Sequence, residues 1–140
     1  MQLVLLMGLA LLASVQAGTQ FAGTWTAEHA GATFVRLELR AASGPPAGEL
    51  ALGDVQVDAK GVVSKAAPAP STGAAIFDVV VKGSTLSFAR KDGNDTDRFE
   101  ATRIGDELEL RFILTEEFRK ELAAEGIAEL KPVRLHRAAK

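Results

Sequence analysis

Two histidines, His29 and His136, are the side chains best suited to bind a metal ion in this 140-residue chain. They lie in the first and last segments with strand patterning, which are neighbours in a closed barrel. Two imidazoles are too few for a closed zinc site, and no carboxylate stands at a spacing that would supply a third ligand. His136 also alternates with Leu135 and Arg137, so we expect it to face solvent. The sequence therefore predicts no metal site and no cofactor.

An acidic turn at 92–97 is a second candidate, because its Asp and Asn oxygens recur at alternate positions, as they do in a calcium loop. The segment lacks the glycine at which a calcium loop bends and the terminal bidentate Glu. A plain hairpin turn explains it better. The chain also has no Gly-x-Ser-x-Gly motif, phosphate loop or paired-carboxylate motif. These observations predict that the protein is not an enzyme.

The N-terminal segment has the composition of a cleavable signal peptide. Residues 3–13 are apolar and uncharged, and a small-x-small cleavage site, Ser-Val-Gln-Ala, follows at 14–17. The apolar run is too short to span a bilayer comfortably, and it lacks the preceding Lys or Arg that such leaders usually carry. We expect cleavage after Ala17, export to the periplasm or the medium, and one mature domain at 18–140.

The chain contains no cysteine, so it can form no disulfide and has no site for a lipidated cysteine. The absence of disulfides from a small exported domain favours a bacterial source. The 16 Lys and Arg residues are interspersed with the 18 Asp and Glu residues, and the net charge is -2. We therefore expect no nucleic-acid partner and, after cleavage, no stable membrane anchor.

Alternating apolar and polar residues dominate the mature chain. Between 33 and 40, for example, Val35, Leu37 and Leu39 share one face. Nine segments follow the pattern: 21–28, 33–40, 49–57, 62–66, 74–82, 85–90, 98–104, 107–114 and 132–137. Short turn signals join most of them. We therefore predict an all-β fold, an antiparallel up-and-down meander β-barrel of about 8–9 strands, with a two-sheet sandwich as the alternative.

Two connections are longer than a hairpin turn. The first, 66–75, is rich in Pro and Ala and is predicted to be a mobile surface loop. The second contains a predicted short helix at about 116–125, before the last strand, with Thr115 as its N-cap and Gly126 at its end. We expect this helix to plug or flank one end of the barrel, with a lid that opens for ligand as the alternative.

The inward faces of the predicted strands carry large apolar side chains. The candidates for contact with a bound molecule are Trp25, Leu37, Leu39, Val79, Val81, Phe88, Leu110 and Phe112. In a barrel of eight strands, such side chains can also fill the interior completely. A remaining void of roughly a few hundred cubic ångströms would indicate a ligand site, and a solid core would exclude one.

The segment Gly23-Thr24-Trp25 opens the first predicted strand, and Arg137 lies on the inward face of the last one. This combination resembles the calycins, small barrels that include lipocalins, fatty-acid-binding proteins, avidins and a bacterial inhibitor of secreted metalloproteases. The resemblance implies that Gly23, Trp25 and Arg137 close the barrel bottom, with the guanidinium on the indole face. It does not extend to biotin, which avidins enclose with several Trp and a Tyr, because this chain has one Trp and no Tyr.

Two functions follow from the resemblance. The first is a non-enzymatic binding protein for a small apolar or amphipathic ligand held in the lumen. The second is a periplasmic protein-interaction module, such as a protease inhibitor or an envelope accessory protein. The calycin inhibitor inserts its N-terminus into its enzyme, and the segment 18–20, which we expect to be free, is comparable with that tail.

Overall fold

The computed structural model describes residues 18–138, and the predicted signal peptide, 1–17, lies outside the described residues. Strands account for most of the described range. Its elements are β1 (Gly23–His29), β2 (Ala32–Arg40), β3 (Ala47–Leu52), β4 (Val55–Val57), β5 (Val63–Ala66), β6 (Ala74–Lys82), β7 (Thr85–Asp92), β8 (Asp95–Ile104), β9 (Glu107–Ile113), α2 (Glu116–Ala124) and β10 (Val133–Arg137).

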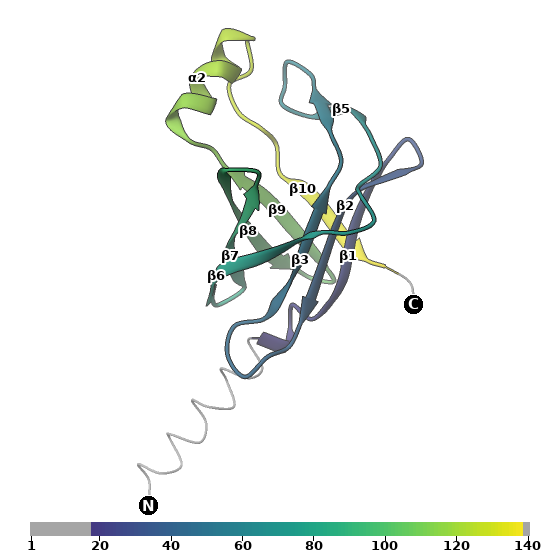
Figure 1. Cartoon of the computed structure of the whole chain (residues 1–140). Coiled ribbons are helices and arrows are strands. Elements are labelled where there is room, and N and C mark those ends of the chain that lie inside the picture. The colour runs from purple at the N-terminus through teal and green to yellow at the C-terminus, as the bar shows by residue number, and fades with distance from the viewer. Residues whose placement is uncertain (1–17, 139–140) are drawn as a thin grey trace, which may run out of the picture.

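Eight strands of the described chain close into an antiparallel barrel in the order β1-β10-β9-β8-β7-β6-β3-β2 (Figure 1). Strands that follow one another in the chain are neighbours in the barrel, except that β4 and β5 leave it to form a separate two-stranded sheet. The pairing of β1 with β10, at Trp25 with Arg137 and at Thr26 with His136, completes the ring. The predicted up-and-down barrel is confirmed, and the two-sheet sandwich is excluded.

The period-two pattern that predicted the strands also builds the core. In β2, Val35, Leu37 and Leu39 are buried inside the barrel. Strands β7 and β8 contribute Phe88 and Phe99, whose rings stack with their centroids 5.4 Å apart. Each such side chain leaves water at a gain of roughly 25 cal/mol per Å² of apolar surface. This gain determines which face of each strand points inward.

The predicted strand at 49–57 is wrong as a single element. The chain leaves the barrel after Leu52, and β4 pairs with β5 outside the barrel. Gly53 lies at the break, where a Cβ atom would stand 1.9 Å from the carbonyl oxygen of Ala67. The N–H of Ala67 in turn donates to the carbonyl of Asp54 at 2.8 Å. Two backbones therefore cross at a residue without a side chain, and the crossing directs the β4–β5 hairpin away from the barrel wall.

The connection predicted to be mobile, between β5 and β6, is anchored to β2. The backbone N–H of Ala69 donates to the carbonyl of Thr33 at 2.8 Å. The guanidinium of Arg36 donates to the carbonyls of Pro70 and Ser71, both at 2.8 Å. The Pro- and Ala-rich composition could not reveal these bonds, because their partners lie more than thirty residues away in the chain.

Helix α2 begins and ends at the capping residues that the sequence predicted. The Oγ1 of Thr115 accepts a hydrogen bond from the N–H of Phe118 at 3.1 Å. Gly126 has a φ of 80°, and the N–H of Ile127 donates to the carbonyl of Leu122 at 2.9 Å, as in a Schellman motif. Figure 1 shows α2 beyond one end of the barrel, so the helix flanks that end and does not plug it.

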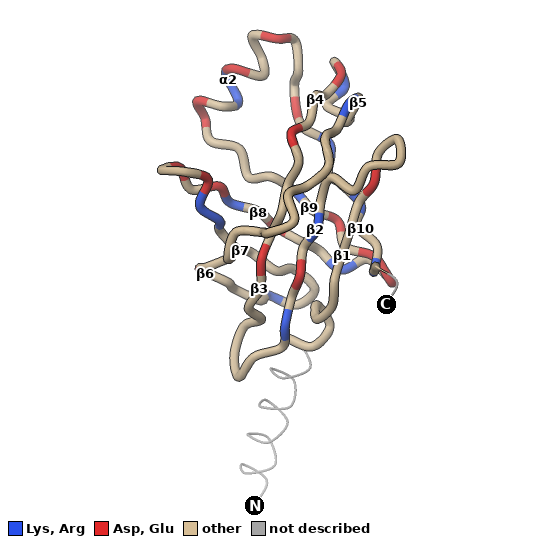
Figure 2. The backbone as a smooth tube through the Cα atoms, turned by 45° about the vertical axis from the view of Figure 1, so that its right-hand side comes forward, with Lys and Arg blue, Asp and Glu red and all other residues tan. Residues whose placement is uncertain are grey.

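Charged residues of both signs are spread over the described surface. Figure 2 shows Lys and Arg interspersed with Asp and Glu over the strands and their connections. Some of them pair across strands, such as Arg134 of β10 with Glu107 of β9 at 3.1 Å. Within 18–138, no helix has both the length and the apolar character needed to cross a membrane.

Candidate functional site

Trp25 lies at the end of the barrel next to residues 18–22, which we call the closed end, and its side chain is completely buried. The indole Nε1–H donates to the carbonyl of Phe21 at 2.9 Å. Arg137, which faces Trp25 in the β1–β10 register, places its Cζ atom 4.2 Å from the ring centroid. Its guanidinium also donates to the carbonyl of Ala22 at 2.5 Å. The structure thus brings Trp25 and Arg137 together in cation–π contact.

Gly23 provides the space for this contact. Its φ is 130°, a backbone conformation that residues other than glycine rarely adopt. A Cβ atom at this position would stand 2.6 Å from Nη1 of Arg137. The three residues of the motif, Gly23, Trp25 and Arg137, therefore form one packed unit at the closed end.

Arg103 is a member of this unit that the sequence analysis missed. Its Cζ atom lies 5.3 Å from the centroid of the Trp25 ring, and its guanidinium donates to the carbonyl of Gln20. Arg103 follows Phe99 and Ala101 on the inward face of β8, and both of these residues are buried. An arginine at the next position of the face that carries Phe99 and Ala101 was the signal that could have identified it.

The segment 18–20 is folded against the closed end, which corrects the expectation of a free tail. The N–H of Phe21 donates to the carbonyl of Gly18 at 3.4 Å, and the N–H of Ala22 donates to the carbonyl of Thr19 at 3.2 Å. The side-chain amide of Gln20 donates to the carbonyl of Gly83 at 3.0 Å. The buried ring of Phe21 holds the segment in place.

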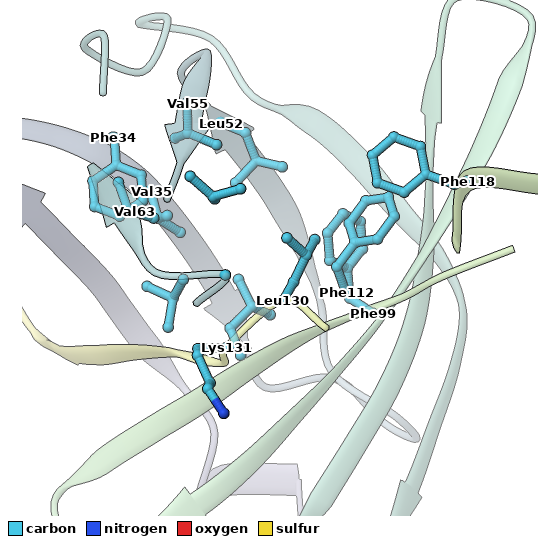
Figure 3. Close-up of a pocket in the computed structure, with 14 residues that line it drawn as sticks. Phe34, Val35, Leu52, Val55, Val63, Phe99, Phe112, Phe118, Leu130 and Lys131 are labelled. Carbon is cyan, nitrogen blue, oxygen red and sulfur yellow. The ribbon is translucent and has the colours of Figure 1, made fainter. Parts of the chain in front are cut away.

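An apolar cavity of about 240 Å³ lies at the opposite, open end of the barrel (Figure 3). Its wall combines barrel strands with α2, the β4–β5 hairpin and the segment 127–132, which we call the strap. Among the residues that line it are Phe34, Val63, Phe112, Phe118, Leu130 and Val133. Lys131 is the one charged residue in the lining, and Figure 3 shows its amine directed away from the apolar side chains. We call this cavity the pocket.

Two of the predicted lumen residues, Leu110 and Phe112, line the pocket. The other six do not line it and lie in the core. Four of these six are buried, namely Trp25, Leu37, Leu39 and Phe88. Val79 and Val81 are partly buried against that core. These six side chains therefore fill the part of the barrel around Trp25, and the pocket lies at the open end.

Most of the pocket comes from residues that the sequence analysis did not select. Phe34 is buried although it lies on the charged face of its strand pattern. An aromatic ring on a face otherwise occupied by arginine and glutamate was a usable signal. Phe118 and Leu130 come from the segment between the last two barrel strands. Whether these two side chains line the pocket depends on the path of that segment across the open end, which the sequence pattern does not give.

Backbone contacts join the strap to the β4–β5 hairpin. The N–H of Lys131 donates to the carbonyl of Gly61 at 2.9 Å. Gly61 has a φ of 79°, and a Cβ atom on it would stand 1.9 Å from the carbonyl oxygen of Glu129. The ring of Phe118 adds a contact between α2 and the barrel, with its centroid 6.0 Å from that of Phe112. The strap and the β4–β5 hairpin are therefore held together at Gly61.

The Nζ of Lys131 bonds Glu129 Oε1 at 2.5 Å. The hydrogen bond and charge of Lys131 hold the pKa of the Glu129 carboxyl below its usual range. The pair is therefore formed at neutral pH and is lost as the pH falls through that lowered pKa. Both side chains are at least half exposed, at 50% for Lys131 and 66% for Glu129. Exposed ion pairs of this kind contribute little to stability.

The two histidines make separate contacts. The Nε2 of His29 lies 3.2 Å from the carbonyl oxygen of Ser64, and the Nε2 of His136 lies 3.1 Å from Oε2 of Glu28. Within the described range, no three His, Cys, Asp or Glu side chains are grouped as metal ligands. The acidic turn at 92–97 is a tight hairpin in which Asp92 faces Asp95.

Comparisons with protein-family models, with curated proteins and with solved structures found no match to this chain. The chain forms a closed eight-stranded antiparallel barrel with the pocket at its open end.

Proposed function

We propose that the protein is an exported, non-enzymatic barrel of the calycin type that binds a small apolar or amphipathic molecule at its open end. The observation that carries this proposal is the pocket of about 240 Å³ with its almost wholly apolar lining. An apolar cavity of about 150 Å³ is already large enough to bind benzene. The pocket therefore suits a small ring system or an alkyl chain of medium length.

The closed end supports the calycin part of the proposal. An eight-stranded barrel, a Gly-x-Trp segment at the start of its first strand and an arginine from its last strand on the indole are combined here. This packing stabilises one end, so that the other end can remain hollow. A barrel with both ends filled would have no room for a ligand.

Export is part of the same proposal. We expect the chain, expressed in a bacterium with its first 17 residues, to be recovered from the periplasm or the medium. Mass spectrometry of the intact protein should then give the mass of a chain that begins at Gly18. Recovery of the uncleaved chain from the cytoplasm would contradict the assignment.

The contacts of the segment 18–20 do not specifically support the alternative, a protein-interaction module. The segment that would enter a protease is bound to the closed end through Gln20 and the buried ring of Phe21. The pocket therefore favours ligand binding over protein interaction through the tail.

The test uses N-phenyl-1-naphthylamine, a neutral probe whose fluorescence increases in apolar surroundings. We expect the wild-type protein to bind it saturably. The variant Val55→Trp places a larger side chain at the pocket wall and should weaken binding about tenfold or more, because it occupies the volume that the probe needs. Val55 is 45% exposed, so the larger side chain should not overpack the barrel core and the variant should still fold.

The matched control is Val80→Trp, because Val80 is similarly exposed, at 47%, and lies on β6 away from the pocket. We expect this variant to bind the probe as the wild type does. Failure of the wild type to bind, or equal loss in the two variants, would overturn the assignment of the pocket as a ligand site.

A further inference from the structure

The seam between β1 and β10 opens towards the hollow end of the barrel. The register of the two strands pairs Trp25 with Arg137 and Thr26 with His136, and the N–H of Ala138 donates to the carbonyl of Thr24 at 2.8 Å on the side of the closed end. Beyond Thr26, β1 carries a bulge between Ala27 and Glu28 in its pairing with β2. A bulge bends its strand and increases the local twist. Strands β1 and β10 therefore part, although each keeps its other neighbour to its end.

A second cavity of about 240 Å³, which we call the side cleft, occupies the place where the strands part. It is bounded by the end of β1, the start of β10, β5 and the strap. Four residues line both the side cleft and the pocket: Phe34, Val63, Lys131 and Val133. The two cavities thus share a wall, and the shared residues include the one charged side chain of the pocket.

The side cleft differs from the pocket in its chemistry. Its lining includes four polar or charged side chains that can face a ligand, Glu28, His29, Lys131 and Arg134. Glu28 is paired with His136 at 3.1 Å. Arg134 is held by Glu107 at 3.1 Å and by Glu109 at 3.5 Å. The side cleft is therefore more polar than the pocket that it adjoins, and three of its four polar or charged residues carry basic groups while one carries a carboxylate.

We propose that the site binds an anionic amphiphile, with its apolar part in the pocket and its anionic head in the side cleft at the ammonium group of Lys131. This inference rests on the proposed function, because it assigns the ligand class of the same pocket. Lys131 is the one charged residue that lines both cavities. A carboxylate, sulfonate or phosphate head would satisfy the same chemistry.

The position of Lys131 explains how it can accept such a head. Its carboxylate partner, Glu129, is a neighbour on the same exposed strap. Because an exposed ion pair is weak, an incoming anion can replace Glu129 at little cost. The backbone of Lys131 stays fixed meanwhile by its bond to Gly61 at 2.9 Å. Glu129 therefore competes with the ligand head for the ammonium group.

The experiment compares two probes that share one ring system. 8-Anilinonaphthalene-1-sulfonate carries an anionic group that N-phenyl-1-naphthylamine lacks. We expect Lys131→Gln to weaken binding of the sulfonate about fivefold to tenfold, as loss of one charge-assisted contact does. Binding of the neutral probe should change less than about twofold. Glu129→Gln should strengthen sulfonate binding, because it removes the competing carboxylate.

Lys120→Gln is the matched control, because Lys120 is an exposed lysine of α2 that lines neither cavity. It should leave the affinity for both probes unchanged. Added salt should weaken the sulfonate complex of the wild type and reduce the difference between wild type and Lys131→Gln. Circular dichroism melting curves of each variant exclude binding to an unfolded form.

The outcomes separate the two proposals. Binding of the neutral probe with no effect of Lys131→Gln on the sulfonate would overturn the anionic head site and leave the binding function standing. Equal effects of Lys131→Gln and Lys120→Gln would also overturn it. Failure of the wild type to bind either probe would overturn the binding function and this inference with it.

Discussion

At the scale of residues, Trp25 carries an unusual set of neighbours. Two guanidinium groups, from Arg137 and Arg103, lie 4.2 and 5.3 Å from its ring centroid. Like charges at close range repel each other, but both guanidinium groups lie over the electron-rich indole ring and both donate to the carbonyl of Gln20. The closed end is therefore held by one aromatic ring and by backbone carbonyls that accept from both arginines.

Removal of that ring should be costly. We expect Trp25→Ala to lower the free energy of unfolding by about 3–5 kcal/mol, the range for deletion of a large buried aromatic side chain. The loss also leaves both guanidinium groups without their aromatic partner. Chemical denaturation followed by far-UV circular dichroism measures the effect. A melting temperature equal to that of the wild type would contradict both this role and the calycin resemblance.

A substitution at Gly23 tests whether Arg137 needs the space beside this residue. We expect Gly23→Ala to destabilise the protein by about 2–3 kcal/mol, since the new methyl group meets the guanidinium and the backbone is strained at positive φ. Gly83→Ala is the control, because Gly83 also has positive φ, at 58°, and a Cβ atom there would meet nothing within 4 Å. It should cost about 1 kcal/mol. Equal costs in denaturation experiments would show that Arg137 does not need the space.

At the scale of elements, the pocket depends on the strap, α2 and the β4–β5 hairpin. None of these belongs to the barrel sheet. They are joined by the contact of Gly61 with Glu129 and Lys131 and by the Phe118 ring on Phe112. The barrel supplies a rigid base, and these additional segments give the pocket its side walls.

Gly61→Ala should therefore affect the pocket more than the fold. The new methyl group would stand 1.9 Å from a backbone oxygen that cannot rotate away, so the hairpin and the strap must separate. We expect affinity for N-phenyl-1-naphthylamine to fall about tenfold, while the barrel remains folded. Gly105→Ala, which also changes a residue with positive φ but meets no atom, should leave affinity unchanged. Fluorescence titration of both variants distinguishes these results.

At the scale of the whole molecule, the barrel combines a filled half with a hollow half. The filled half contains the stacked Phe88 and Phe99 rings and the Trp25 unit. The chain has no cysteine, so no disulfide supports this arrangement. Any ligand that binds the folded state alone adds to its stability by mass action.

Saturation with a ligand should therefore raise the melting temperature. At a free concentration of about 100 times Kd, N-phenyl-1-naphthylamine should add about 2.7 kcal/mol to the free energy of unfolding. For a domain of this size, that corresponds to a rise of roughly 10 °C. Val55→Trp, if it binds tenfold more weakly, gains only about 1.4 kcal/mol at the same probe concentration, so its rise should be about half as large or less. A thermal shift that is equal in the two proteins would place the probe outside the pocket.

Much of the fold was predictable because it rests on local patterns. Alternating residues such as Val35, Leu37 and Leu39 identified the strands, and short turns between them identified the meander. Thr115 and Gly126 predicted the ends of α2, since capping depends on neighbouring backbone groups. The break at Gly53 was missed, because its cause is a crossing with Ala67.

The sequence by itself determined the barrel class and the helix, since these depend on periodicity and on capping residues, and the contact of Arg137 with Trp25 was expected from the resemblance to the calycins. The tertiary structure decided where the lumen is filled. It also placed Arg103 at the closed end and Phe34 in the pocket, and it joined the side cleft to the pocket at Lys131. These features depend on side-chain volumes summed across several strands and on the point where β1 and β10 part, and no single stretch of sequence contains either.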